Sequence, residues 1–292
     1  MSVTLREIES QPAAWRRAAD LAGEVGFQLP SPGQRIAVIG CGTSFYVAQA
    51  VAVARESAGA GESDAFAASE MPTGRSYDSV LAISRSGTTT EVVRALMGLP
   101  AQTPSLALSA VPDSPVVRSA RDAVVMAFAD ERSIVQTRFA TSALALIRAH
   151  IGEDLEPAIA DAERCLAEPL PVDPADFEHF VFLGAGWTVG LACEAALKFR
   201  EAAGAWTEAY PAMEYRHGPI SVAGAGSLVW ILGRAPSGLV ADIERTGATV
   251  LEGTVDPMAE LVQIQRAAVA LAQARGLDPD QPQHLTRSVV LP

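Results

Sequence analysis

Three ionisable side chains that could carry acid/base chemistry lie in the stretch EAALKFREAAGAWTEAYPAMEYRHGP, Glu194 to Pro219. They are Lys198, Glu201 and His217, and the last is one of only four histidines in the chain. A carboxylate and an imidazole can both have their pKa tuned toward neutrality, so Glu201 and His217 form a candidate proton-transfer pair. A polar helix end followed by a turn at His-Gly-Pro would contain the same residue types, and this alternative stays open.

A second polar segment, SRSGTTT, follows a short apolar run and precedes a predicted helix. It offers hydroxyls, a guanidinium and the unpaired N–H groups of a helix N-terminus, which together suit a phosphate. A single Ser or Thr would be enough for an ordinary N-cap, so the excess of hydroxyls favours an anion site. The residues concerned are Ser84, Arg85, Ser86, Gly87, Thr88 and Thr89.

The elements that must position these groups alternate between strand and helix, which predicts a parallel sheet covered by helices on both faces. The first half is expected to begin with one helix, followed by four strands and a long apolar helix. The second half restarts with a strand, a G-x-G turn and a helix. The predicted ranges are helices Leu5–Val25, Thr137–His150, Leu239–Thr246 and Pro257–Arg275, and strands Ile36–Ile39, Val80–Ile83, Ser105–Ser109, Ala123–Phe128, Leu228–Leu232 and Ala248–Leu251.

The two halves are similar to each other in sequence pattern. IAVIGCGTSFYVAQAVAVARE aligns with FVFLGAGWTVGLACEAALKFRE, so that Gly40 and Gly42 match Gly184 and Gly186. This repeat predicts an internal duplication, with domains 1–168 and 169–292 divided near the Pro-rich segment EPLPVDPAD. The second-half segment GRAPS has lost most of the hydroxyls of SRSGTTT, so one phosphate site is expected, in the first half.

Composition excludes several classes of protein. The chain has 292 residues, 49% hydrophobic and 19% charged, which is enough for a sizeable core. A net charge of −12 argues against nucleic acid as a partner. There is no apolar run of membrane-spanning length and no apolar signal core, and three separated cysteines fit a reducing compartment, so a cytoplasmic protein without a membrane partner is expected.

The glycine pattern does not predict a nucleotide cofactor. Gly40 and Gly42 lack the third glycine of a dinucleotide loop, and no Gly-Lys-Ser/Thr follows as in a P-loop. The sequence also contains no His-rich metal cluster and no G-x-S-x-G elbow. We therefore expect neither a cofactor nor a metal.

Taken in order, the stretches EIESQP, GCGTS, SRSGTTTE, ERSIVQTRFATSAL, EAALKFRE, EAYPAMEYRHGP and DQPQHLTRSV resemble the sugar isomerase (SIS) domain family. They are similar to the isomerase half of glucosamine-6-phosphate synthase and its stand-alone relatives. The resemblance implies an α/β fold of two tandem SIS subdomains, each a flavodoxin-like three-layer sandwich. It also implies a homodimer with a shared active site and a phosphorylated sugar or aminosugar as the ligand.

The family resemblance also assigns roles to residues. Glu201 would be the base that moves a proton between C1 and C2, Lys198 would sit close by, and His217, supplied by the partner subunit, would help open the sugar ring. The residues implied for substrate and phosphate binding are Cys41, Gly42, Thr43, Ser44, Ser84, Arg85, Ser86, Gly87, Thr89, Ile134 and Arg287.

Departures from the family narrow the expected activity. The glutaminase domain of the synthase is absent from this sequence, so a glutamine-independent aminosugar-phosphate deaminase/isomerase is expected. Arg287 replaces the family lysine and cannot readily form an imine, whereas Arg85 adds a cation beside the phosphate loop. A sugar-phosphate-binding regulator and a deglycase of fructosamine-type phosphates remain alternatives. His284, in the tail beside Arg287, is a further candidate to reach the site, against the alternative of a solvated tail residue.

Overall fold

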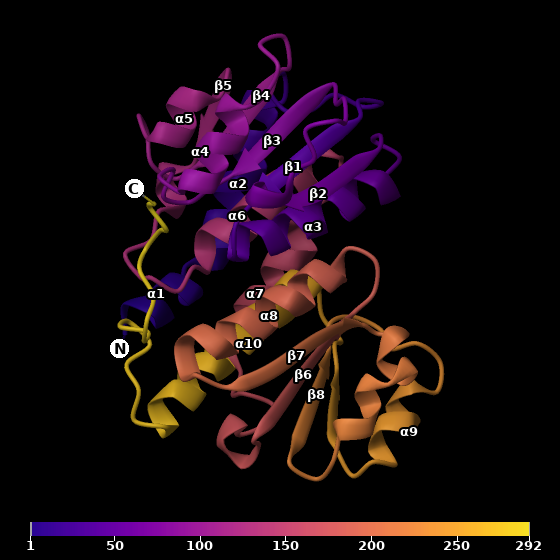
Figure 1. The fold of residues 1–292 in the computed structure, drawn as a ribbon. Coiled ribbons are helices and arrows are strands. Elements are labelled where there is room, and N and C mark those ends of the chain that lie inside the picture. The colour runs from indigo at the N-terminus through magenta and orange to yellow at the C-terminus, as the bar shows by residue number, and fades with distance from the viewer. Residues whose placement is uncertain (1, 292) are drawn as a thin grey trace. The chain divides into compact units, whose positions relative to one another are not determined.

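The computed structural model describes residues 2–291, which form two compact units (Figure 1). The first unit contains residues 13–132, 138–155 and 286–291. The second unit contains residues 2–12, 133–137 and 156–285. Both units are therefore assembled from segments that lie far apart in the sequence. The division predicted at 168/169 stays a prediction.

The first unit is built on a five-stranded parallel sheet of order β2-β1-β3-β4-β5. From β1 the chain adds β2 on one side and then β3, β4 and β5 on the other, so the strand order reverses between β1 and β3. Open α/β sheets bind ligands at such a switch point. The elements are α2 (Gln11–Val25), β1 (Ile36–Gly40), α3 (Thr43–Ser57), β2 (Ser63–Ala67), η1 (Ala68–Glu70), β3 (Ser79–Ile83), α4 (Thr90–Met97), β4 (Ser105–Ser109), α5 (Pro115–Ser119), β5 (Asp122–Val125), η2 (Ala127–Ala129) and α6 (Arg138–His150).

Helices cover both faces of the first sheet. The five residues of β1 are all buried, because side chains that alternate between the faces meet a helix on either side. On one face Ala37, Ile39 and Val80 pack against Val92 of α4 and Val116 of α5. Helix α3 packs against β1, β2 and α6. The sheet is thus held rigidly enough to present the loops at the carboxyl ends of its strands.

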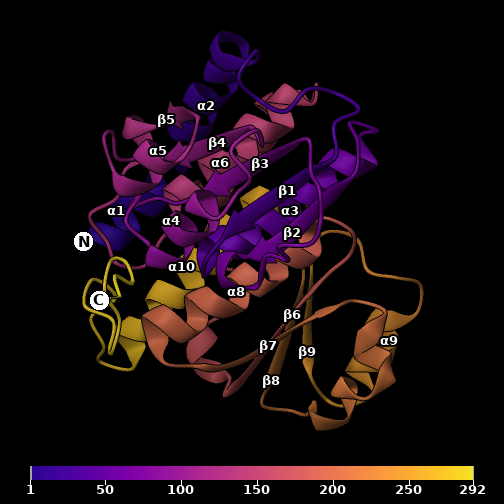
Figure 2. The same cartoon turned by 45° about the horizontal axis from the view of Figure 1, so that its top comes forward.

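The second unit repeats this order with four parallel strands, β7-β6-β8-β9. Helices α8 and α10 lie on one face and α9 on the other, as Figures 1 and 2 both show. Its elements are α1 (Val3–Glu9), α7 (Glu156–Ala167), η3 (Pro174–Asp176), β6 (His179–Gly184), α8 (Thr188–Ala203), β7 (Trp206–Pro211), η4 (Glu214–His217), η5 (Pro219–Val222), β8 (Ser227–Ile231), α9 (Leu239–Glu244), β9 (Thr249–Glu252) and α10 (Pro257–Ala274).

Helix α8 is fixed to this sheet by aromatic packing. The Phe199 ring lies 4.7 Å from that of Phe180 and 5.2 Å from that of Phe182, measured between centroids. All three side chains are buried, so truncating Phe199 to alanine would cost about 3–5 kcal/mol. The helix ends at Gly204, which adopts the left-handed conformation (φ 57°) typical of a C-terminal cap. Because both features fix the last turn of α8, the side chains on that turn have defined positions.

The predicted helix Leu5–Val25 is wrong as a single element, because it is two helices, α1 and α2. Pro12 has no N–H to donate to the Ile8 carbonyl, and the Gln11 side chain donates to that carbonyl instead. Two strands, β2 and β7, were not predicted. Both lie at the edge of their sheet and are only partly buried, so they lack a continuous apolar run.

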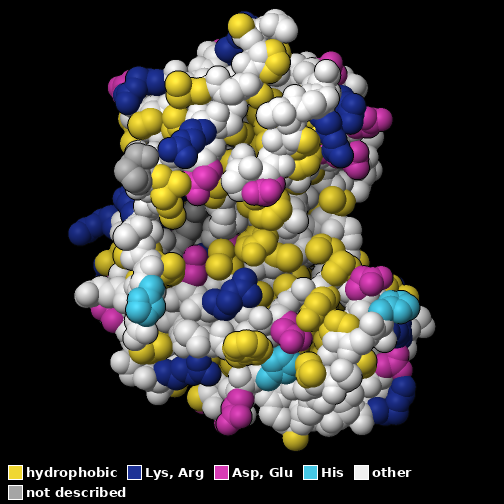
Figure 3. Space-filling view, viewed as in Figure 1, with side chains coloured by type: hydrophobic (Ala, Val, Ile, Leu, Met, Phe, Trp, Pro, Cys, Tyr) yellow, Lys and Arg dark blue, Asp and Glu magenta, His cyan; other side chains and the backbone are white. Residues whose placement is uncertain are grey.

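The four strands predicted in the first half are confirmed as β1, β3, β4 and β5 to within a few residues. In the second half β8 and β9 are confirmed in the same way. Among the described residues, none of the helices is both long and apolar enough to span a bilayer. On the face drawn in Figure 3, basic and acidic side chains are interspersed.

Candidate functional site

The turn between β1 and α3 of the first unit is shaped by two glycines. A Cβ on Gly40 would lie 2.5 Å from the backbone of Ser44, so only glycine fits there. Gly42 has φ 54°, in the left-handed region that favours glycine. Thr43 and Ser44 therefore enter α3 with buried side chains at the carboxyl end of β1. Burial raises the pKa of the Cys41 thiol, against the lowering effect of a backbone hydrogen bond with Ala68, so the thiol remains protonated at neutral pH.

The loop between β3 and α4 lies at the neighbouring strand end, since β1 and β3 are paired. Ser84 and Ser86 are buried, and the Ser86 hydroxyl accepts hydrogen bonds from the Thr88 N–H (3.3 Å) and hydroxyl (3.1 Å). Gly87 has φ 65°, and a Cβ there would lie 2.0 Å from the Ser114 hydroxyl oxygen. The loop is thus a tightly packed turn rich in hydroxyls at the N-terminus of α4, as expected for anion binding.

Arg85 has partners within the first unit that the sequence does not predict. Its side chain is 4% exposed, donates to the Arg287 carbonyl (2.9 Å), and lies 3.9 Å from the Glu131 carboxylate. Glu131 in turn accepts hydrogen bonds from the first N–H groups of α6, at Arg138 (2.8 Å) and Phe139 (3.3 Å). Arg85 therefore joins the phosphate-loop segment to the C-terminal tail and to the start of α6.

The tail is attached to the same loop at several further points. The Thr90 N–H donates to the Val289 carbonyl (3.2 Å), and the hydroxyls of Thr88 and Ser288 are 2.8 Å apart. The Arg287 guanidinium is paired with Asp130. Within the first unit, Arg287 is therefore placed close to the SRSGTTT loop, as the family resemblance implies, although its charge faces a carboxylate.

The predicted base, Glu201, lies in the last turn of α8 in the second unit. The Lys198 ammonium is hydrogen-bonded to the Glu201 carboxylate and lies 3.4 Å from the Glu194 carboxylate. Lys198 and Glu194 are 1% and 0% exposed, whereas Glu201 keeps 19% of its side chain exposed. The buried lysine thus holds one carboxylate that remains accessible at the surface.

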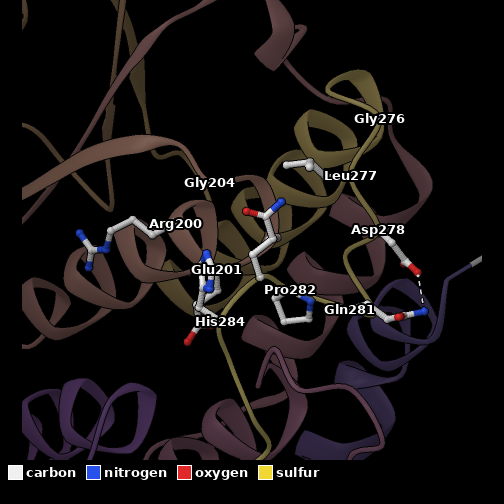
Figure 4. Close-up of a pocket in the computed structure, with 11 residues that line it drawn as sticks. Arg200, Glu201, Gly204, Gly276, Leu277, Asp278, Gln281, Pro282 and His284 are labelled. Carbon is white, nitrogen blue, oxygen red and sulfur yellow. Dashed lines mark hydrogen bonds between the residues drawn. The ribbon is translucent and has the colours of Figure 1, made fainter.

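Glu201 lines a cavity of about 310 Å³ within the second unit (Figure 4). One wall comes from the end of α8, and the other from the segment that follows α10, including Asp278 and His284. This segment is anchored by Asp280, whose carboxylate accepts hydrogen bonds from the N–H groups of Val3 (2.6 Å) and Thr4 (2.8 Å) at the start of α1. No local pattern in the sequence signals this cavity, because its walls come from segments that are distant in the chain.

Among residues 2–291, those that line this cavity do not include His217. It is exposed at the end of η4, which follows the carboxyl end of β7, whereas Glu201 precedes the amino end of that strand. Ile134 is half-buried in the short segment 133–137 of the second unit. Among residues 2–291, no group of three or more His, Cys, Asp or Glu side chains could hold a metal ion.

Residues 31–150, which contain both hydroxyl-bearing loops, match the SIS domain family. This part of the chain is therefore similar to SIS domains. The match ends before α7 and the second sheet. Comparisons over the whole chain include the second unit as well.

Such comparisons extend the similarity beyond residues 31–150. The chain is 26% identical to a glutamine–fructose-6-phosphate aminotransferase (isomerizing) of Methanothermobacter thermautotrophicus, in an alignment that covers 98% of this chain and 57% of the relative. A similar enzyme of Sulfurisphaera tokodaii is 25% identical, with 98% and 56% covered. The chain thus spans little more than half the length of these curated relatives.

Solved structures share the fold over almost the whole chain. A glucosamine-6-phosphate deaminase of Thermotoga maritima superposes with a TM-score of 0.85 at 26% identity, covering 99% of this chain and all of the other. The C-terminal domain of a glucosamine-fructose-6-phosphate aminotransferase of Francisella tularensis gives 0.76 at 22% identity, covering 97% and 98%. The two-sheet α/β fold predicted from the sequence is therefore confirmed, and the similar proteins belong to the sugar-phosphate isomerases and deaminases.

Proposed function

We propose that this protein is a phosphosugar aldose–ketose isomerase/deaminase that acts on an aminosugar phosphate, such as a hexosamine 6-phosphate, without glutamine. The observation that carries the proposal is the Glu201 carboxylate on the wall of an open cavity, held by the buried Lys198. A carboxylate that is accessible yet fixed in position is what proton transfer between adjacent carbons requires. Similarity to a glucosamine-6-phosphate deaminase over the whole chain supports the same class of reaction.

The proposed reaction needs one base and a positioned substrate. Glu201 takes the proton from C2 of the open-chain aminosugar and returns it to C1, which converts the C2 amine into an imine. Water then adds to that imine carbon, and ammonia leaves, so that the products are the ketose phosphate and ammonia. Proton transfer by a positioned carboxylate contributes roughly 10²–10⁴-fold to the rate.

The hydroxyl-rich loops of the first unit are proposed to bind the phosphate and sugar hydroxyls. The N-terminus of α4, with Ser84, Ser86 and Thr89 near it, presents donors to an anion, and the turn at Gly42 does the same before α3. Binding energy from a phosphate remote from C1 and C2 would orient the reacting carbons. Neither step calls for a cofactor in this proposal.

The deglycase alternative depends on a free arginine to bind the adduct's carboxylate. Arg85 is buried and engaged with Glu131 and the Arg287 carbonyl, and the Arg287 guanidinium is paired with Asp130. These contacts favour an aminosugar phosphate as the substrate. Plain isomerisation without loss of ammonia would use the same base. Analysis of the products distinguishes it from deamination, because only deamination releases ammonia.

We further propose that His217 serves the site of a second copy of the chain. Strand β7 has six residues and so spans roughly 17 Å, and it intervenes between Glu201 and His217 in the second unit. Trp206 on the same edge strand is 78% exposed, and Met213 and Val222 beyond it are 52% and 62% exposed. An apolar edge of this kind suits contact with another copy, which would supply the ring-opening histidine.

The decisive experiment measures ammonia release from glucosamine 6-phosphate and galactosamine 6-phosphate by the wild type and by Glu201→Gln. We expect release by the wild type and a loss of about 10²–10⁴-fold in the variant. Glu244→Gln, which makes the same isosteric change at an exposed helix end of the second unit, is the control and should retain activity. Equal activity in Glu201→Gln would refute the assignment of the base.

Sharing of the site between copies can be tested with mixed oligomers. Glu201→Ala and His217→Ala would each be inactive alone, and a mixture allowed to exchange subunits should regain part of the wild-type activity. Exchange is verified by mass spectrometry of differently tagged chains. Mixed oligomers that form but stay inactive would contradict a histidine supplied by the partner copy.

A further inference from the structure

The cavity that contains Glu201 offers few groups that could move a second proton. An aldose–ketose or aminoaldose–ketose interconversion moves one proton between carbons and another between the heteroatoms on those carbons. A single carboxylate accounts for the first of these movements. The ionisable residues that line the cavity are Arg200, Glu201, Asp278 and His284.

Two of these residues are poorly suited to the second transfer. Arginine stays protonated in proteins, and Arg200 donates to the Thr207 hydroxyl (3.1 Å) and extends away from the other labelled side chains in Figure 4. The Asp278 carboxylate accepts hydrogen bonds from the Asp280 N–H (2.9 Å) and the Gln281 side chain (3.3 Å). These bonds engage the carboxylate within the turn that contains Asp278. Lys198 is buried behind Glu201 and does not line the cavity.

His284 differs from these residues in both chemistry and backbone. Imidazole is the side chain that most readily gives and accepts protons near neutral pH. The residue adopts φ 62°, a left-handed conformation that is uncommon and costly outside glycine and that accumulates at functional sites.

The segment that carries this residue is anchored just before it. Asp280 ties the segment to the start of α1, and Pro282 is buried two residues before His284. Figure 4 draws His284 among the residues that line the cavity, on the segment that follows α10. A strained, anchored histidine on the wall that faces the base is what a positioned second acid/base group requires.

We propose that His284 is the residue that transfers the heteroatom proton in the Glu201 cavity, an inference that rests on the proposed function. As Glu201 takes the C2 proton, the protonated His284 gives its proton to O1, forming the enaminol. Glu201 then returns its proton to C1, and the neutral His284 removes a proton from the nitrogen on C2, leaving the imine. Both residues end in their starting states, and no oxidant or reductant is needed.

The test compares His284→Asn and His284→Gly with the wild type. Asparagine tolerates the positive φ but does not titrate, and glycine removes the backbone strain as well as the ring. We expect kcat to fall by about 10²–10⁴-fold in both variants, with the limb of the kcat–pH profile that reports this group lost. Added imidazole should restore part of the turnover of His284→Gly, since the cavity is open to solvent.

Solvent exchange gives a readout that a structural role would not alter. In D2O, when Glu201 removes the C2 proton but no proton reaches the heteroatoms, deuterium is returned to C2 of the substrate. We therefore expect more deuterium in the recovered substrate, relative to the amount of product formed, in His284→Asn than in the wild type. Unchanged kcat, pH profile and exchange ratio would overturn the proposal, as would full activity of His284→Gly without imidazole. Absence of turnover in the wild type, or turnover that survives Glu201→Gln, would instead refute the proposed function.

Discussion

Helices α3 and α8 occupy equivalent places in the two units but bury different side chains. Each follows the strand that is second from one edge of its sheet, through a G-x-G turn, and a Cβ on Gly40 or Gly184 would meet the backbone four residues on at 2.5 Å or 2.3 Å. Aligned on these glycines, Ala50 and Ala54 of α3 correspond to Glu194 and Lys198 of α8. All four positions are buried, so the same fold accommodates either alanines or an ion pair.

This difference separates what the fold needs from what the site needs. A buried ion pair is weak evidence for stability, because desolvation opposes the attraction between the charges. Since α3 packs without one, the pair in α8 is better explained by its contact with Glu201, whose equivalent in α3 is Ser57. Conversely, the β3–α4 loop has four hydroxyls, whereas the β8–α9 loop, GRAPSG, has only that of Ser237. The first unit therefore carries the loop expected to bind the phosphate, and the second unit carries the expected base.

The largest effect should come from making α8 resemble α3. Lys198→Met alone removes the positive charge 3.4 Å from the buried Glu194 carboxylate and should cost about 3–5 kcal/mol of stability, measured by chemical unfolding. Glu194→Leu combined with Lys198→Met should recover most of that stability but not ammonia release, because Glu201 has lost its partner. Full activity in the double variant would mean that the ion pair has no role in positioning Glu201.

A second difference concerns one glycine in the β3–α4 loop and one in the β8–α9 loop. Gly87→Ala places a Cβ 2.0 Å from the Ser114 hydroxyl oxygen at φ 65°, so left-handed strain and a clash together should cost about 3 kcal/mol. Gly233→Ala, at φ 89°, meets its nearest atom only at 3.9 Å and should cost about 1 kcal/mol from strain alone. Thermal unfolding of both variants measures the difference between their losses of stability. Equal losses would show that the β3–α4 loop is not more tightly packed than the β8–α9 loop.

Loss of a loop hydroxyl should affect substrate binding in one unit only. Ser86→Ala should raise KM for the sugar phosphate by about 10- to 100-fold with a much smaller change in kcat, because a hydrogen bond to a charged group contributes about 1.5–3 kcal/mol. Ser237→Ala, at the exposed equivalent loop of the second unit, is the matched control and should leave KM unchanged. Equal KM values in the two variants would argue against a phosphate at the β3–α4 loop.

The smallest effect concerns the anchors of the C-terminal segment. Burial acts to raise the pKa of Asp280, but hydrogen bonds from Thr4 and Val3 outweigh it and hold that pKa below its ordinary value. A lowered folded-state pKa stabilises the protein above the unfolded-state pKa of about 3.9, and this stabilisation is lost as pH falls through the folded-state value.

Asp280→Asn should therefore cost about 1–2 kcal/mol between pH 5 and 8, and the difference from wild type should shrink below about pH 4. Asp130→Asn, which removes an exposed pairing with Arg287 in the first unit, should cost about 0–1 kcal/mol. Urea unfolding across this pH range measures both. A difference for Asp280→Asn that does not change with pH would contradict the role of its charge.

Local patterns allow much of this fold to be predicted. The buried strands with continuous apolar runs, such as Ile36–Gly40 and Ser105–Ser109, are predictable because burial on both faces leaves a clear signal. The edge strand β7 lacks this signal, because its residues, such as Glu208 and Tyr210, are only half-buried. Edge strands are defined by their neighbour in the sheet rather than by their own sequence.

The site is predictable to the extent that its residues are neighbours in sequence. The contact of Lys198 with Glu201 follows from three-residue spacing on a helix. The partners of Arg85 and the cavity wall at His284 depend on segments that are distant in the sequence, which no local pattern reports. The roles assigned to His217, Ile134 and Arg287 from family resemblance stay predictions.

The hydrogen bonds from Val3 and Thr4 to Asp280 have a consequence for synthesis on the ribosome. Helix α1 leaves the exit tunnel long before residue 280, and its N-terminal N–H groups gain their carboxylate only after that residue has emerged. The second unit therefore lacks these hydrogen bonds while most of the first unit is being translated. Contacts of such long sequence separation close slowly, and we expect nascent chains that stall before residue 280 to be cleaved by proteases near α1.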